Sequence, residues 1–161
     1  MKENVKNHFT KYKILTIFSI LFCCLLYSQN NIPFEKKFFS DDIYLYQLKA
    51  SINGVKTNLI IDTGASYSSL QDSFIEKLLE LNVITLENIS PTLQKVYGVL
   101  GDEKGLLSIK INNITIQNKT FNDVSFLITK SDKVPNIIGL NILERLEKIT
   151  LDFQDMELQI K

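Results

Sequence analysis

The chain has 161 residues, and its 18 basic and 18 acidic side chains give it a formal charge of zero. This length suits a single domain, and the balanced charge gives no electrostatic reason to expect nucleic acid as a partner. The single histidine and both cysteines lie within the first 29 residues.

Residues 1–29 have the pattern of a secretory signal peptide. Residues 1–13 carry four lysines and one glutamate, and residues 14–27 form an apolar run of 14 residues. A helix that spans a bilayer needs about 20 residues, whereas a short apolar run after a basic head is typical of a cleaved leader. We therefore expect export, either to a periplasm or out of the cell. An uncleaved segment that anchors the protein in the membrane is the alternative.

Cleavage after residue 29 would leave a chain without histidine or cysteine. That chain would be mildly acidic, because the leader takes away more lysine than glutamate. A Ser-His-Asp triad, a cysteine nucleophile and a Cys/His zinc site cannot be built from the remaining residues. We expect neither a metal nor another cofactor.

The exported part is predicted to be one mainly β domain. Residues 30–41 are expected to form an N-terminal arm, and residues 42–161 the domain itself. Residues 43–52 alternate apolar and polar side chains, which predicts a strand. The pair Asn53-Gly54 then predicts a tight hairpin, with residues 55–62 as the return strand.

A helix is expected to begin at Asp72 or Ser73, because Ser73 and Glu76 fit a capping box. Further along, Gly98, Gly101 and Gly105 predict a mobile turn. The segments on either side of this turn look like the arms of a hairpin, at residues 95–97 and 106–111. Several short apolar stretches, one short helix and a final hairpin follow, at residues 114–116, 121–129, 137–138, 141–146, 148–153 and 156–160. Many short strands with few helices predict a closed, barrel-like or sandwich-like β domain.

The return strand delivers Asp62 into a turn that continues with Thr63 and Gly64. A buried carboxylate is costly unless something uses or satisfies it. The small residues after Asp62 let the backbone fold round the carboxylate and donate hydrogen bonds to it. The alternative is a structural aspartate in an Asx-turn.

The motif Asp62-Thr63-Gly64-Ala65, together with the later segment 136–143, resembles the retropepsin-like aspartic proteases, which include retroviral enzymes and exported bacterial proteins. The segment 136–143 (NIIGLNIL) has the paired β-branched residues, glycine and asparagine of the second family signature. The glycine-bearing segment 97–105 occupies the place of the family's flap. The resemblance covers residues 42 to 160 and implies the retropepsin fold.

The resemblance implies a role for each matching residue. Asp62 would be the catalytic carboxylate, Thr63 would donate its hydroxyl across a two-fold axis, and Gly64 would give an N–H to the carboxylate. Neighbouring residues would pack beside and below this loop and support it. A flap would close over a bound peptide. The supporting residues are Ala65, Ser66, Ile138 and Gly139, and the flap residues are Tyr97, Gly98, Val99, Leu100 and Gly101.

The chain departs from the retroviral pattern in its second signature and at its end. Leu140 replaces the arginine that follows the signature glycine, and charged residues follow the flap at 102–104. The chain also continues past Phe153, about where retroviral enzymes stop. This extension makes the terminal-strand dimer interface of those enzymes uncertain here.

Aspartic protease chemistry needs two carboxylates that share a proton, and this chain supplies one Asp-Thr-Gly. The sequence therefore predicts an aspartic endopeptidase that acts on peptides or proteins as a homodimer, with Asp62 from each copy. Because Ala65 cannot donate a hydrogen bond to the ionised pair, we expect activity at weakly acid to neutral pH. The alternative is a non-catalytic domain of the same fold that binds peptides or assembles with envelope proteins.

Overall fold

The structure is a computed structural model that describes residues 16, 19, 31–40, 42–92, 96–98, 101–103, 107–130, 134–146 and 148–160. Residues 32–161 form one compact unit. Among the described residues, no helix has the length and apolar character needed to cross a membrane.

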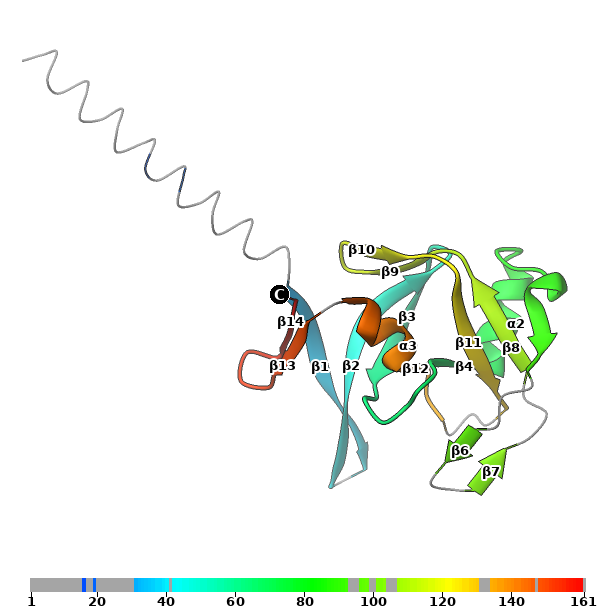
Figure 1. Cartoon of the computed structure of the whole chain (residues 1–161), viewed down its shortest axis with the longest axis horizontal. Coiled ribbons are helices and arrows are strands. Elements are labelled where there is room, and N and C mark those ends of the chain that lie inside the picture. The colour runs from blue at the N-terminus through cyan, green and yellow to red at the C-terminus, as the bar shows by residue number, and fades with distance from the viewer. Residues whose placement is uncertain are drawn as a thin grey trace, which may run out of the picture. The chain divides into compact units, whose positions relative to one another are not determined.

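The described part of the compact unit is mainly β, as the sequence predicts (Figure 1). Its largest sheet follows the order β13-β14-β1-β2-β3-β12-β4-β11-β8-β5, and β9 joins it through β2 while β10 pairs with β9. The strands are β1 (Asn31–Ser40), β2 (Ile43–Ile52), β3 (Val55–Ile61), β4 (Ser69–Gln71), β5 (Ile89–Pro91), β8 (Leu107–Ile111), β9 (Ile114–Ile116), β10 (Lys119–Phe121), β11 (Val124–Thr129), β12 (Ile137–Ile138), β13 (Ile149–Asp152) and β14 (Glu157–Ile160).

The sheet is not closed, which corrects the prediction of a closed, barrel-like domain. In the described chain, β13 stands at one end of the strand order and β5 at the other, and these two strands do not pair. The residue Pro91 belongs to β5. Proline has no N–H to donate to a ladder, so it fits an edge strand.

The hairpin predicted at Asn53-Gly54 is confirmed. Strands β2 and β3 are antiparallel, and their innermost pair is Ile52 with Val55. Both turn residues have positive φ, 47° at Asn53 and 84° at Gly54. This is the left-handed conformation that asparagine and glycine adopt most readily.

The segment predicted as an N-terminal arm is strand β1, so it belongs to the sheet. It pairs antiparallel with β2 on one side and neighbours β14 on the other. The Nζ atom of Lys49 lies 2.6 Å from Oε1 of Glu35 across the β1–β2 pair. The hydrogen bond and positive charge of Lys49 hold the pKa of Glu35 below its usual value.

Helix α2 (Asp72–Glu80) lies where the apolar spacing predicts it, and it packs against β4 and β11. The capping box predicted at Ser73 is wrong. The N-cap is Gln71, which makes no side-chain capping bond, and Ser73 N–H instead bonds Oδ1 of Asp72 at 2.8 Å. A capping box does occur at the short 3-10 turn η1 (Leu86–Asn88).

The described residues of the hairpin arms predicted at 95–97 and 106–111 do not pair with each other. Strand β6 (Val96–Gly98) pairs with β7 (Gly101–Glu103) as a separate two-stranded sheet. Strand β8 joins the large sheet instead, between β11 and β5. Its alternating buried side chains Ile109 and Ile111 explain this, because they enter the core.

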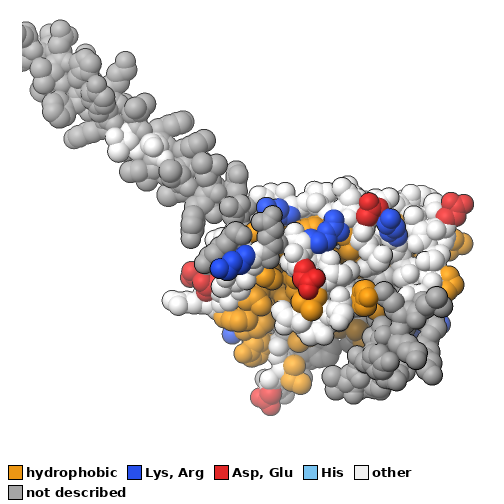
Figure 2. Space-filling model, viewed as in Figure 1, with side chains coloured by type: hydrophobic (Ala, Val, Ile, Leu, Met, Phe, Trp, Pro, Cys, Tyr) orange, Lys and Arg blue, Asp and Glu red, His pale blue; other side chains and the backbone are white. Residues whose placement is uncertain are grey.

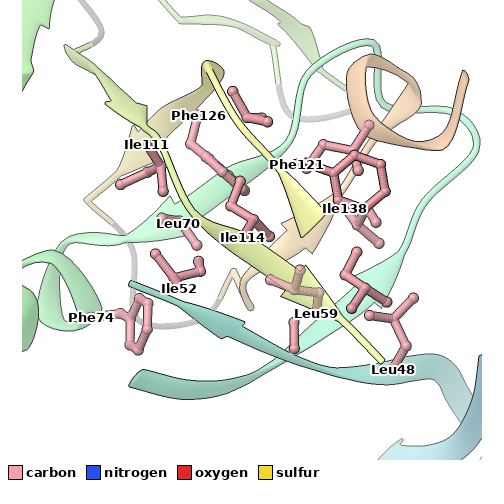
Figure 3. Close-up of a cluster of buried hydrophobic side chains, with 14 of the residues drawn as sticks. Leu48, Ile52, Leu59, Leu70, Phe74, Ile111, Ile114, Phe121, Phe126 and Ile138 are labelled. Carbon is pink, nitrogen blue, oxygen red and sulfur yellow. The ribbon is translucent and has the colours of Figure 1, made fainter. Parts of the chain in front are cut away.

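The hydrophobic core lies between the strands and α2 (Figure 3). It includes side chains from segments far apart in the sequence, among them Leu48, Leu59, Leu70, Phe126 and Ile138. All five are at most 1 % exposed. Since Ile138 is part of the second signature, core packing fixes that segment beneath the Asp62 turn.

Candidate active site

Asp62 comes directly after the last residue of β3. The two-residue strand β12 lies between β3 and β4, parallel to the former and antiparallel to the latter. Its Ile138 carbonyl accepts the Asp62 N–H at 3.1 Å. The position of Asp62 is therefore set by a segment from the C-terminal part of the chain.

The backbone after Asp62 folds round its carboxylate. Gly64 N–H donates to Oδ1 of Asp62 at 2.9 Å, and Ala65 N–H donates to the Asp62 carbonyl at 3.3 Å. Asp62 is half-buried, whereas Thr63 and Gly64 are exposed. One carboxylate oxygen is thus held by the loop, and the Thr63 side chain is open to contact from outside.

The 62–68 loop and the second signature cross at very short distance. A Cβ on Gly139 would lie 2.7 Å from the Ala65 carbonyl oxygen and 2.7 Å from the Tyr67 carbonyl carbon. No side chain fits there. The crossing is closed by backbone bonds from Leu140 N–H to the Ala65 carbonyl at 2.8 Å and from Asn141 N–H to the Ser66 carbonyl at 3.2 Å.

A buried polar network ties the far end of the same loop to the signature. The Ser68 side chain accepts the Gly139 N–H at 2.9 Å and donates to Oδ1 of Asn141 at 2.8 Å. The Ser68 N–H bonds the same oxygen at 2.8 Å. The Asn141 amide nitrogen reaches the Ser125 carbonyl on β11 at 2.9 Å. Since Ser68 is 0 % exposed, these bonds satisfy groups that water does not reach.

Asn136 makes a second connection, one step earlier in the signature. Its carbonyl accepts the Ile60 N–H at 2.8 Å, and its side-chain oxygen accepts the Gln71 N–H at 2.8 Å. Its amide nitrogen donates to Oγ1 of Thr57 at 3.0 Å. Asn136 therefore joins the strand before Asp62 to the strand after it.

Ser68, Asn136 and Asn141 have no predicted role, although Asn136 and Asn141 lie within the second signature. The available signal is that each is a polar residue next to a short apolar stretch, and such a residue must find a partner when it is buried.

The predicted flap residues fall on β6, on β7 and between these strands. Tyr97 pairs with Asp102 and Gly98 with Gly101. Val99 and Leu100 lie outside the described residues. The other predicted site residues, from Asp62 to Ser66 with Ile138 and Gly139, come together at the end of β3. Among the described residues, no group of three or more acidic, histidine or cysteine side chains could hold a metal ion.

Comparison with known proteins matches the chain to a family. A family model described as gag-polyprotein putative aspartyl protease matches residues 48–145. The chain belongs to this aspartyl protease family. The matched stretch contains the Asp62 loop, the β6–β7 hairpin and the crossing at Gly139.

A search of solved structures gives the same answer for the fold. The chain is similar to the crystal structure of a retropepsin-like aspartic protease from Rickettsia conorii, with a TM-score of 0.57 and 22 % sequence identity. The match covers 80 % of this chain and 87 % of that one. No curated protein matches the chain. At this identity the similarity shows the fold, which is the retropepsin-like fold that the Asp-Thr-Gly motif and second signature predict.

Proposed function

We propose that this member of the aspartyl protease family is an exported aspartic endopeptidase that cleaves peptides or proteins as a homodimer. The observation that carries the proposal is the Asp62 turn, in which the Gly64 N–H holds one carboxylate oxygen and the loop is bound to the second signature. The Gly64 bond alone would also suit an Asx-turn. The backbone bonds that join the loop to the second signature, at Asp62, Leu140 and Asn141, are the additional support.

The reaction needs a second carboxylate, and the sequence offers no second Asp-Thr-Gly. Two copies of Asp62 supply the pair. One carboxylate, ionised, accepts a proton from a water molecule as that water attacks the peptide carbonyl carbon. The other carboxyl group, protonated, donates a hydrogen bond to the carbonyl oxygen. Collapse of the tetrahedral intermediate then breaks the C–N bond as the nitrogen takes up a proton.

Three other parts of the site have roles in this proposal. Thr63 is exposed in the single chain. In the dimer, Thr63 of each copy donates its hydroxyl to the loop of the other copy across the two-fold axis. The hairpin formed by β6 and β7 closes over the bound peptide. Apolar residues Tyr97, Val99 and Leu100 would favour apolar side chains next to the cleaved bond.

The test is cleavage of a mixed peptide library by the exported form and by Asp62→Asn. The amide cannot act as a carboxylate, so this variant is expected to lose all cleavage while it keeps its fold and its oligomeric state. Asp155→Asn is a matched control, because it makes the same change at an exposed residue of the β13–β14 turn. Full cleavage by Asp62→Asn would reject the proposal.

A statine-type mimic of the tetrahedral intermediate gives a second measurement. It should inhibit cleavage by the wild type and bind Asp62→Asn more weakly. Peptide binding without any cleavage by the wild type would assign the non-catalytic alternative instead.

Export is part of the proposal and rests on the leader-like composition of residues 1–29. N-terminal sequencing of the protein recovered from outside the cytoplasm should find a start near residue 30. Recovery of the whole chain from the membrane fraction would favour an uncleaved anchor.

A further inference from the structure

The ribbon formed by β1 and β2 continues past the active-site loop. The β2–β3 pairing ends at Gln47 with Ile60, and β3 itself ends one residue later. Strand β2 begins at Ile43, so its first four residues, 43–46, pair with β1 alone in the described chain. Continuing the antiparallel register by two residues places Leu45 beside Asp62. The β1–β2 ribbon extends past the end of β3, the strand that leads into Asp62 (Figure 1).

One face of this ribbon carries a row of aromatic rings. Phe38 of β1 pairs with Tyr44 of β2, with ring centroids 6.4 Å apart, and Tyr44 lies 5.6 Å from Tyr46. Tyr46 lies 4.8 Å from Phe153 and 5.3 Å from Phe34. We call these five residues the aromatic face.

The aromatic face runs from the core out into solvent. Phe34 is 3 % exposed, but Tyr44 is 46 %, Phe153 is 53 % and Phe38 is 73 % exposed. Figure 2 shows hydrophobic side chains gathered on this side of the domain. Leaving large contiguous apolar surface in water is unfavourable by roughly 25 cal/mol per Å², and such patches mark interaction sites.

On the side away from β2, β1 neighbours the four-residue strand β14, and the Phe34 N–H bonds the Met156 carbonyl at 2.9 Å. A partner that docks on the aromatic face would be held by side chains. This differs from an interface made by the exchange of terminal strands, since the last strands here pair within their own chain.

The charges on the ribbon are complementary to those of a second copy. Asp42 lies exposed at the turn, and exposed Lys36 lies further along β1, on the same face as Phe38 and Tyr44. The Nζ atom of Lys36 lies 4.7 Å from the ring centroid of Tyr44, within the aromatic face. In an isologous contact the same surface meets itself in opposite directions. The acidic turn of one ribbon then faces Lys36 of the other.

We infer that the aromatic face is the surface on which a second copy of this chain docks to complete the active site. The inference rests on the proposed function, because the need for a second Asp62 is what calls for a second copy. The position of the ribbon beside Asp62 then makes docking and assembly of the carboxylate pair a single event.

The first test removes apolar surface from the ribbon by the double substitution Phe38→Ser with Tyr44→Ser. Sedimentation velocity over a concentration series should show the dimer dissociation constant raised by at least about 100-fold, since each aromatic residue is lost twice in a symmetric interface. Leu86→Ser is the matched control. Leu86 is 72 % exposed, close to the 73 % of Phe38, but it lies on η1 outside the ribbon. This control should leave the dissociation constant unchanged.

The second test exchanges charges. Asp42→Lys replaces the acidic charge at the turn by a basic one, and Lys36→Asp replaces the basic charge on the aromatic face by an acidic one. Each variant alone should dimerise more weakly than the wild type. A mixture of the two should recover dimerisation, because opposite charges then face each other across the interface. Thermal melting checks that all variants are folded.

The outcomes separate this inference from the proposed function. A dimer constant unchanged by the Phe38 and Tyr44 substitutions overturns the aromatic face as the interface and leaves the shared carboxylate pair intact. A wild type that is monomeric at every concentration also overturns it. A double variant that is monomeric and still cleaves peptides supports the interface but refutes the shared pair.

Discussion

At the scale of single residues, the active-site loop is shaped by backbone and small polar groups more than by charge. The Gly64 N–H orients the Asp62 carboxylate, and Gly139 lets the second signature cross the loop at short distance. The Ser68 hydroxyl binds the end of the loop to the Gly139 N–H. Each of these residues has neighbours that leave little room for a different side chain, so conservative substitutions should have measurable effects.

Gly139→Ala should destabilise the fold by about 1–3 kcal/mol, because its methyl group would meet backbone atoms of Ala65 and Tyr67 that cannot move aside alone. Urea denaturation measures the change. The comparison variant is Gly64→Ala, whose Cβ would meet only the side-chain oxygen of Asp62, at 3.2 Å. It should lose less stability but impair catalysis. Equal stability of Gly139→Ala and the wild type would mean that the crossing is looser than described.

Ser68→Ala should cost about 1–3 kcal/mol, because it leaves the buried Gly139 N–H without an acceptor. Asn141→Ala should cost a similar amount. In a double-mutant cycle the two effects should not add, since both residues share one network. Ser73→Ala on the exposed side of α2 is the control and should change stability by less than about 0.5 kcal/mol. Additive losses would show that the network is not cooperative.

Ala65→Ser should extend activity toward lower pH. A hydroxyl beside the carboxylate pair can donate a hydrogen bond to its ionised form, which keeps one carboxylate ionised in more acid solution. The pH–rate profile of the wild type should have its optimum between weakly acid and neutral pH, and the acid limb of the variant should lie at lower pH. A wild-type optimum below about pH 3 would contradict the reasoning from Ala65.

At the scale of elements, most of the fold follows from local sequence signals. The alternation in 43–52, the Asn53-Gly54 turn and the apolar face of α2 each predicted an element that the structure contains. Apart from the capping box at Ser73, the predictions that failed concern which strands pair with each other. Strand β8 joined the large sheet rather than the flap hairpin, and the sheet stayed open. Pairing between distant strands depends on core packing, which local patterns do not report.

In the candidate site, too, the local features were predictable from the sequence and the long-range contacts were not. The Asp62 turn is a local feature, so its motif and its strand were predictable from a few adjacent residues. Its support depends on β12, a strand of only two residues between β3 and β4. Ser68 and Asn136 form hydrogen bonds with residues far away in the sequence. The residues next to them in the chain do not indicate which groups these partners are.

The β2–β3 hairpin offers a test of how a turn sets the strand that carries Asp62. Asn53→Ala should destabilise the fold by about 1–2 kcal/mol, because alanine is disfavoured at the positive φ of Asn53. It also removes the bond from Asn53 Nδ2 to the Val83 carbonyl at 2.9 Å. Asn53→Gly loses only that bond, so the difference between the two variants in thermal melting isolates the backbone strain. Identical melting would show that strain contributes nothing.

At the scale of the whole molecule, the proposed carboxylate pair, shared between two copies, would link activity to protein concentration. Specific activity should fall on dilution, in step with the dimer fraction measured by sedimentation. Mixing wild type with an excess of Asp62→Asn should also lower activity, because mixed dimers contain one carboxylate and one amide. Activity per molecule that stays constant on dilution into the monomer range would contradict a shared pair.

The position of β12 between β3 and β4 has a consequence for biosynthesis. The ribosome makes Asp62 long before it makes Ile138, whose carbonyl binds the Asp62 N–H. Contacts between such distant positions form late, because a long loop must close first. A growing chain therefore contains Asp62 before it contains β12, the strand that fixes the position of Asp62. In the proposed function, the growing polypeptide has no peptidase activity before Ile138 has been made, and neighbouring proteins in the producing cell are spared until then.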